Sequence, residues 1–209
     1  MRFPALVFLL PALAACASTP TYAPSPESSS PGASSSGAGE YRSSKLDLYL
    51  GGRALHESDW HPVEDQGAIG MEFVHEGHDA PVGFEIALFG SQKTKEDAFG
   101  AIDATGTTGE ISAGIRKTFL KDDSRFHPYI GGGAAFIRAK IEGAVSGASA
   151  HDDDTSGALY MHGGVELDLS PSFLLGLDVR FLGGSDMKLF GRDATADYGQ
   201  LAFLIGVRF

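Results

Sequence analysis

The sequence is poor in several features, and each scarcity excludes a class of protein. There is one cysteine, Cys16, in 209 residues, so no internal disulfide can form. Lys and Arg number 16 against 27 Asp and Glu, for a net charge of -11, which argues against nucleic acid as a partner. No run of 18 or more apolar residues occurs, which excludes a membrane-spanning helix beyond the leader. Glycine (28 residues) and phenylalanine (14) are abundant instead, and this pairing suits close-packed strands with aromatic edges.

The amino terminus has the form of a secretory leader over residues 1–15, in which Arg2 precedes the apolar segment Phe3–Leu13. Cys16 follows Leu13-Ala14-Ala15, a sequence that resembles the lipobox of bacterial lipoproteins. The resemblance implies that Cys16 is acylated and begins the mature chain, and that Ala17, in place of Asp, favours the outer membrane. The alternative is an ordinary leader cleaved near the same site.

Residues 16–44 are rich in Ser, Pro, Gly and Ala, a composition that cannot bury a core. This segment is therefore predicted to be a disordered linker. As a coil it reaches about 30 Å root-mean-square, which is long enough to join a lipid anchor to a separate body over 45–209.

That body alternates apolar and polar residues in eight segments, roughly 45–54, 67–76, 82–90, 108–120, 126–142, 157–169, 172–183 and 197–209. A period of two predicts strands, and each segment has about the 9–11 residues, or slightly more, that a tilted strand needs to cross a bilayer. The sequence predicts an all-β fold, an eight-stranded antiparallel up-and-down transmembrane β-barrel.

The connections between these segments alternate in length. Those at 78–81, 121–125 and 170–172 are tight and rich in turn formers, whereas those near 55–66, 91–107, 143–156 and 184–196 have about a dozen residues or more. Short periplasmic turns and longer outer loops are typical of an outer-membrane barrel. An even strand number places both termini in the periplasm.

One face of each segment is apolar and its only clear charge is Lys117, which can snorkel from one end. In segment 126–142 this face is assigned as Tyr129, Ala135, Ile137 and Ile141. Charges on the opposite face must pair in a narrow interior. The sequence predicts a lumen network of Glu72, Glu85, Arg116, Arg138, Lys140, Glu166, Asp178 and Arg180.

Aromatic residues gather at the predicted periplasmic ends of the apolar faces. They are predicted to form one girdle at the membrane interface, made of Phe73, Phe84, Phe119, Tyr129, Phe173 and Phe209. A soluble lipocalin-like barrel would turn its apolar faces inward instead. The loop pattern, the girdle and a last strand that ends on Phe209 favour the membrane.

Residues 45–209 resemble the eight-stranded OmpA-like and OmpX-like barrels. Pro128-Tyr-Ile-Gly-Gly-Gly-Ala-Ala-Phe136 is similar to the Pro-Tyr-x-Gly-x-Gly strand of that family, and Leu169–Phe181 is similar to its penultimate hairpin. The strand ending at Phe209 resembles the signal read by the barrel-assembly machinery. The resemblance implies fold and location but not activity, because the family includes adhesins, immune-evasion proteins, enzymes and proteins with no known role.

Three groups could carry chemistry. The segments 56–61 and 151–154 combine His with acids and could hold a metal, but the first is predicted to be a mobile loop and the second a solvated acidic tip. Trp60 in the first loop could touch lipid headgroups or a partner. His162, near Glu166 and Tyr160, is predicted to complete the interior network, and no Ser–His pair is found on an outward face.

We therefore expect a Gram-negative outer-membrane β-barrel lipoprotein with a structural or surface-interaction role through extracellular loops. No catalytic residue, cofactor or metal is expected. The expected partners are outer-membrane lipids and lipopolysaccharide, the barrel-assembly machinery, and an extracellular partner that the acidic loops would select for positive charge. Two alternatives remain open: an enzyme that modifies lipid A or phospholipid, and a narrow pore, although eight strands leave an interior that side chains can fill.

Overall fold

The computed structural model describes residues 44–77, 81–96, 102–119, 124–145 and 148–209. Cys16 and the predicted linker up to residue 43 lie outside these ranges. Among the described residues, no helix is both long and apolar enough to cross a membrane.

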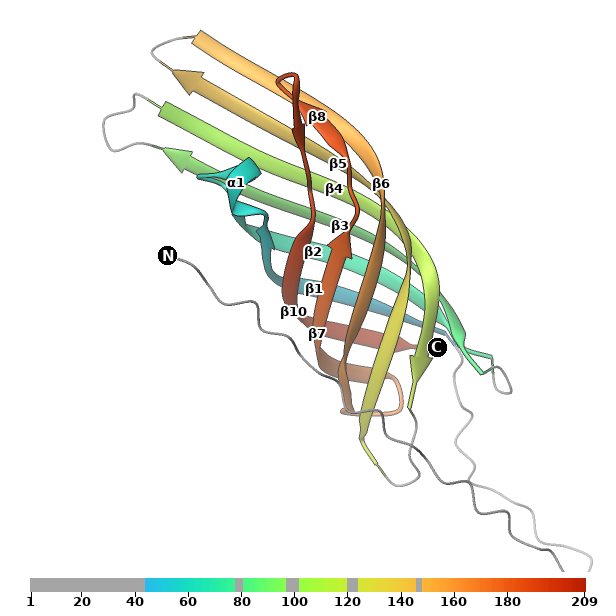
Figure 1. Cartoon of the computed structure of the whole chain (residues 1–209). Coiled ribbons are helices and arrows are strands. Elements are labelled where there is room, and N and C mark those ends of the chain that lie inside the picture. The colour runs from blue at the N-terminus through green and yellow to red at the C-terminus, as the bar shows by residue number, and fades with distance from the viewer. Residues whose placement is uncertain (1–43, 78–80, 97–101, 120–123, 146–147) are drawn as a thin grey trace, which may run out of the picture. The chain divides into compact units, whose positions relative to one another are not determined.

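Eight strands form a closed antiparallel barrel, as the alternation of the sequence predicted (Figure 1). Strand β1 pairs with β10 along its whole length, from Lys45 opposite Arg208 to Leu55 opposite Tyr198. Closure leaves no edge strand in the barrel. Its strands are β1 (Ser44–Leu55), β2 (Asp65–His75), β3 (Gly83–Glu96), β4 (Ile102–Thr118), β5 (Phe126–Val145), β6 (Ala148–Asp168), β7 (Phe173–Gly183) and β10 (Tyr198–Arg208).

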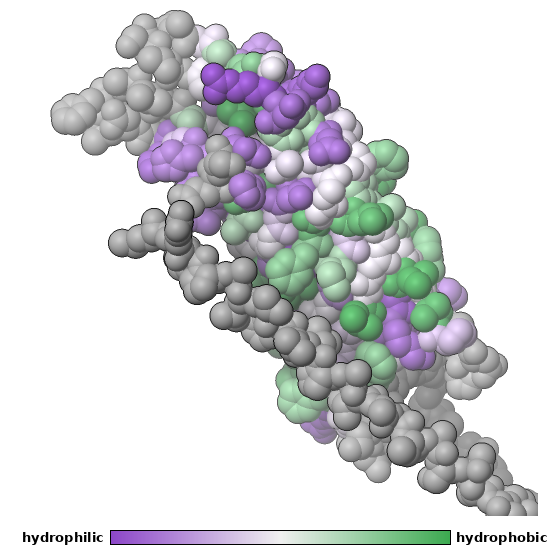
Figure 2. Space-filling view, viewed as in Figure 1, coloured by the Kyte–Doolittle hydropathy of each residue, from purple (hydrophilic) through white to green (hydrophobic). Residues whose placement is uncertain are grey.

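The outside of the barrel is apolar and the inside is polar. Large side chains such as Leu50 and Phe203, each 69% exposed, point outward from every barrel strand. Figure 2 shows apolar side chains over the middle of the barrel and hydrophilic ones gathered towards one end. A continuous apolar surface of this kind exceeds what a water-soluble monomer exposes, whereas closed barrels are one of two structures that can span hydrocarbon.

The two ends of the barrel differ. We call the end that carries Ser44 and Phe209 the proximal end, and the opposite one the distal end. Towards the distal end, glycines occupy the outward positions of seven strands, and beyond them outward side chains such as Gln92 and Thr155 are polar. The apolar band therefore stops at this glycine belt, made of Gly52, Gly67, Gly90, Gly109, Gly157, Gly183 and Gly199.

Strands β3 to β6 continue past the glycine belt as one four-stranded extension, in which β4 and β5 also pair, from Thr107 opposite Lys140 to Ile102 opposite Val145. The connections predicted near 91–107 and 143–156 are wrong as loops, because β3 and β4 pair as far as Glu96 opposite Asp103, and β5 and β6 as far as Val145 opposite Ala148. Thr, Ser and Gly in these segments resembled loop composition, but the extended segments pair β3 with β4, β4 with β5 and β5 with β6, which gives their backbone groups hydrogen-bond partners.

The assignment of faces in β5 is also wrong. Tyr129, Ala135 and Ile137 are buried inside, whereas Ile130 and Phe136 are exposed on the membrane side. A shift of one residue moves every side chain of a strand to the other face. The error arose because Gly131 to Gly133 and Ala134-Ala135 carry no polarity that would fix the register.

Candidate functional site

The proximal part of the lumen is built around Arg116 of β4. Its guanidinium donates to Glu72 at 2.8 Å and to Glu166, and it stacks on the Tyr129 ring, 3.4 Å from the ring centroid. Lys45 of β1 also pairs with Glu166. Strands from opposite sides of the barrel are thus tied together by fully buried charges, which must be paired to be tolerated.

A second cluster fills the lumen nearer the distal end. Arg180 of β7 donates to Glu110 at 2.5 Å and to Ser112 at 2.8 Å, and stacks on Tyr160. Arg53 of β1 reaches the other oxygen of Glu110 at 3.3 Å and stacks on Tyr198. One carboxylate, that of Glu110, therefore holds two arginines, Arg53 and Arg180.

Between these clusters lies His162 of β6. Its Nδ1 is 3.0 Å from Asp178 and its Nε2 is 3.1 Å from both oxygens of Glu85. The expectation that Glu166 is its acidic neighbour is corrected, because Glu166 pairs with Arg116 and Lys45. Tyr129 and Tyr160 donate to Asp178 and Glu85, each at 2.7 Å.

Six of the eight predicted network residues lie in this interior: Glu72, Glu85, Arg116, Glu166, Asp178 and Arg180. Arg138 and Lys140 do not, and their assignment is wrong. Arg138 pairs outside with Asp153 at 2.7 Å and Lys140 with Glu142 at 2.7 Å. Both belong to the β5 extension beyond the glycine belt, where outward side chains are no longer apolar.

The distal mouth is closed by two connections. The short helix α1 (Glu57–Trp60) and the hairpin of β8 (Met187–Leu189) and β9 (Arg192–Ala194) meet in one apolar cluster. Trp60 is fully buried there and its indole N–H donates to the Thr195 carbonyl at 2.7 Å. The prediction that Trp60 meets lipid or a partner is therefore wrong, because it packs in this plug, together with Val63, Met187, Leu189 and Ala196.

The acidic segment at 151–154 is part of β6 and holds the β8–β9 hairpin in place. Alternate side chains of β6 accept backbone N–H groups from β8 and its neighbours: Ser156 from Asp186 at 2.9 Å, Asp154 from Lys188 at 2.7 Å, and Asp152 from Phe190. The prediction that segment 151–154 is a solvated acidic tip is therefore wrong, because Asp152 and Asp154, like Ser156, accept hydrogen bonds from the backbone of the hairpin. We call these three side chains the acceptor ladder. Nothing in the sequence indicated this role, because a run of acidic residues looks the same in a solvated loop as in a strand that accepts hydrogen bonds.

Five predicted girdle residues face outward at the proximal end, and the rings of Phe73 and Phe209 lie 6.4 Å apart. The others are Phe84, Phe119 and Phe173. Tyr129 does not belong to the girdle, because it is buried and donates to Asp178. Phe126, which is exposed at the same end of β5, stands where Tyr129 was expected.

A Ser–His pair exists at the proximal rim, contrary to expectation. Ser44 Oγ and His75 Nδ1 are 2.9 Å apart, at the start of β1 and the end of β2. Sequence reasoning missed the pair because Ser44 was assigned to the linker, one residue before the first predicted strand.

Together these features define an eight-stranded transmembrane β-barrel with a charged, filled lumen and a closed distal mouth. No family model matches the sequence, and no curated protein matches it. The fold is similar to that of Neisserial surface protein A, with 14% identity and a TM-score of 0.54 over 79% of this chain and 96% of that one. It is also similar to Ail, the attachment invasion locus protein of Yersinia pestis, with 16% identity and a TM-score of 0.55 over 79% of this chain and 97% of that one.

Proposed function

We propose that the protein is an outer-membrane barrel lipoprotein with a structural or surface-binding role carried by its distal end. The closed mouth is the observation that carries this proposal. A lumen filled with paired charges and capped by Trp60, Met187 and Leu189 argues against a pore and favours a function at the surface.

The distal end favours positively charged partners. Segments 56–65, 91–107, 138–156 and 184–197 together carry 14 acidic and six basic residues. A cavity of about 590 Å³ there is lined by Asp59, Asp154, Asp186 and Asp193 beside Lys188. A surface of one sign attracts ligands of the other. Ail has been solved with the heparin analogue sucrose octasulfate, and the acid excess here argues for a ligand of opposite charge.

Binding to proteoliposomes tests this role. A short lysine-rich peptide should co-sediment with the full protein at low salt, and less so as salt rises. Asp186→Asn combined with Asp193→Asn should weaken binding several-fold, since both side chains are exposed at the cavity. Glu142→Gln, on the β5 extension and outside the cavity, is the matched control. Equal binding by all three proteins, with unchanged envelope permeability in a deletion strain, would remove the proposal.

The anchor needs its own test. Acylation of Cys16 would place the termini and the proximal girdle on the periplasmic side. Palmitate supplied to growing cells should label the wild-type protein and not Cys16→Ser. A labelled Cys16→Ser protein, or an unlabelled wild type, would show that the leader is of the ordinary kind.

The enzymatic alternative rests on the Ser44–His75 pair. If it acted on envelope lipids, Ser44→Ala would change the lipid profile as deletion of the gene does. We expect mass spectrometry of lipids from the wild type, the deletion strain and the Ser44→Ala strain to give the same profile.

A further inference from the structure

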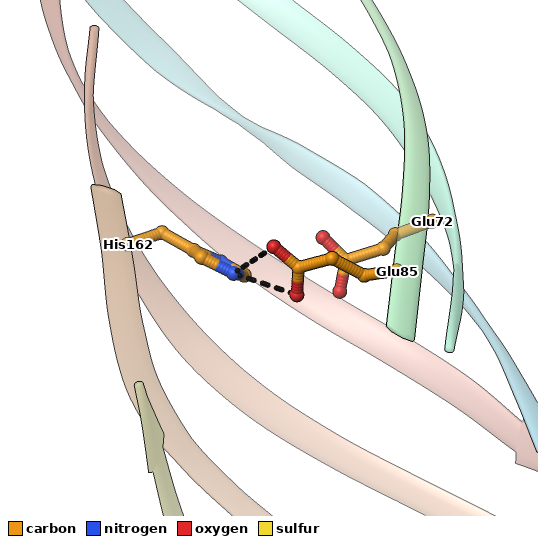
Figure 3. A group of neighbouring side chains, drawn as sticks. All are labelled: Glu72, Glu85 and His162. Carbon is orange, nitrogen blue, oxygen red and sulfur yellow. Dashed lines mark hydrogen bonds and ion pairs between the residues drawn. The ribbon is translucent and has the colours of Figure 1, made fainter. Parts of the chain in front are cut away.

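Three potential metal ligands converge inside the barrel, separately from the distal surface. They are Glu72 of β2, Glu85 of β3 and His162 of β6, which faces the two acids from across the lumen (Figure 3). One ligand atom from each lies within 4.8 Å of the others, and all three side chains are buried. Ligands about 2.0–2.2 Å from a zinc ion lie roughly 3.3–3.5 Å from one another, so small movements would complete a site.

The histidine is oriented as metal-binding histidines are. Asp178 lies 3.0 Å from Nδ1 and is itself held by the Tyr129 hydroxyl at 2.7 Å. A carboxylate at one ring nitrogen favours a proton there and turns the lone pair of the other nitrogen towards the metal. Here that nitrogen, Nε2, points at both oxygens of Glu85 at 3.1 Å. In this tautomer the lone pair of Nε2 faces the oxygens of Glu85, and either a metal ion between them or a second proton on the ring would satisfy these acceptors.

The buried charges of the interior also have an excess of carboxylates, which a bound cation would balance. Among the described residues, the buried groups include six carboxylates and four permanent cations, which gives a net charge of -2 when the buried histidines are neutral. Within the same described residues, Glu72 Oε2 is buried and has no hydrogen-bond partner, whereas Oε1 pairs with Arg116, and a buried acceptor without a partner is destabilising. These carboxylates are Asp47, Glu72, Glu85, Glu110, Glu166 and Asp178, and the cations are Lys45, Arg53, Arg116 and Arg180.

The wall beside the three ligands is thinned by Gly131. A Cβ at this position would lie 2.4 Å from His162 Nε2 and 2.9 Å from Glu85 Oε2. Any larger residue would push the imidazole and the carboxylate out of place. Glycine at this position therefore keeps the ligand atoms together.

We propose that Glu72, Glu85 and His162 bind one divalent transition-metal ion inside the barrel. One imidazole nitrogen with carboxylate oxygens is a donor set suited to Zn²⁺. The ion neutralises the net charge of the interior and ties β2 and β3 to β6. Its role is structural, because the closed mouth keeps substrates away from it.

Refolding with and without metal tests the site. The untagged full chain is unfolded, freed of metal with chelator, and refolded in detergent with Zn²⁺, or with Co²⁺ as a coloured probe. We expect one metal ion per chain after dialysis, a Co²⁺ absorption band of a nitrogen- and oxygen-ligated site, and an unfolding midpoint that rises with Zn²⁺ concentration.

Two variants locate the ion. Glu85→Gln should lose the bound metal and its spectrum, whereas His127→Gln should keep both, because His127 is a lumen histidine that bonds Asp168 at 3.0 Å and lies outside the group of three. If the wild type retains no metal and unfolds identically with and without Zn²⁺, the three groups share a proton and the proposal is overturned. That comparison needs no variant to fold, and its result does not bear on the surface role.

Discussion

At the scale of single residues, ion pairs in this barrel differ in value according to where they lie. Arg180 is fully buried and its partner Glu110 is shared with Arg53. Arg138 has a pair of similar length with Asp153, but its side chain is 67% exposed. Removing one partner of a buried pair leaves a charge uncompensated, whereas an exposed pair is screened by water.

We therefore predict that Arg180→Met lowers the free energy of unfolding by about 3–5 kcal/mol. Arg138→Met, the matched control, should change it by about 0–1 kcal/mol. Urea unfolding in lipid vesicles measures both, with the single tryptophan, Trp60, as the fluorescent reporter. Equal losses in the two variants would mean that the lumen network contributes no more than surface charge does.

At the scale of elements, the sequence predicts strands well where polarity alternates and poorly where it does not. Burial alternates along the full length of β1, β7 and β10, and their faces were assigned correctly from the residues that do alternate in polarity. The membrane-spanning part of β5 contains three glycines and two alanines in a row. The strand then continues past the membrane, where Arg138 and Lys140 face outward in water. The charged residues Arg138 and Lys140 were assigned to the lumen because charge is excluded from the membrane face. Beyond the glycine belt both faces of the strand can carry charge, so charge no longer distinguishes them.

The plug at the distal mouth could not be predicted from the sequence, because it depends on contacts between distant segments. Its contacts join α1, β8 and the β6 extension, which lie far apart in the sequence and carry no shared period. Asp59 accepts from Thr195 at 3.0 Å across 136 positions of the chain, and Asp154 accepts from Lys188. Such contacts follow from the closed barrel, which brings the distal connections over one mouth.

Docking of the β8–β9 hairpin should depend on pH through Asp154, which lies on the β6 extension beyond the membrane. The N–H of Lys188, and then that of Thr155, holds the pKa of this carboxyl below its ordinary value of 3.8. A lowered pKa in the folded state means that the stabilisation is complete above the ordinary value and is lost as the pH falls through the lowered one. The hairpin should therefore loosen only in strong acid.

Acrylamide quenching of Trp60 measures this loosening, because Trp60 packs against Met187 and Leu189. We expect quenching to be constant from neutral pH down to about pH 4 and to rise steeply below it. Asp154→Ala should at least double the quenching constant at neutral pH. Asp153→Ala, whose carboxylate pairs outside with Arg138, should match the wild type; if it behaves like Asp154→Ala, the acceptor ladder is not what holds the hairpin.

At the scale of the whole molecule, every feature depends on which solvent covers the apolar face. If hydrocarbon does, a charge placed in the middle of that face costs about 2–4 kcal/mol, falling to about 0–1 kcal/mol near the interfaces. If water does, the same change costs little and improves solubility. Leu48 of β1 is 53% exposed between the girdle and the glycine belt, whereas Gln92 of β3 points outward beyond the belt.

Leu48→Arg should therefore lower the free energy of unfolding in lipid vesicles by about 2–4 kcal/mol, and Gln92→Arg should leave it nearly unchanged. Both proteins should still run as compact, heat-modifiable species on unboiled gels, because neither change touches the lumen. The difference between the two variants follows from depth in the bilayer alone, since each adds the same side chain to an outward position of a barrel strand. Equal stability of the two variants, together with a wild type that stays dispersed without detergent, would mean that the apolar face is not in a membrane.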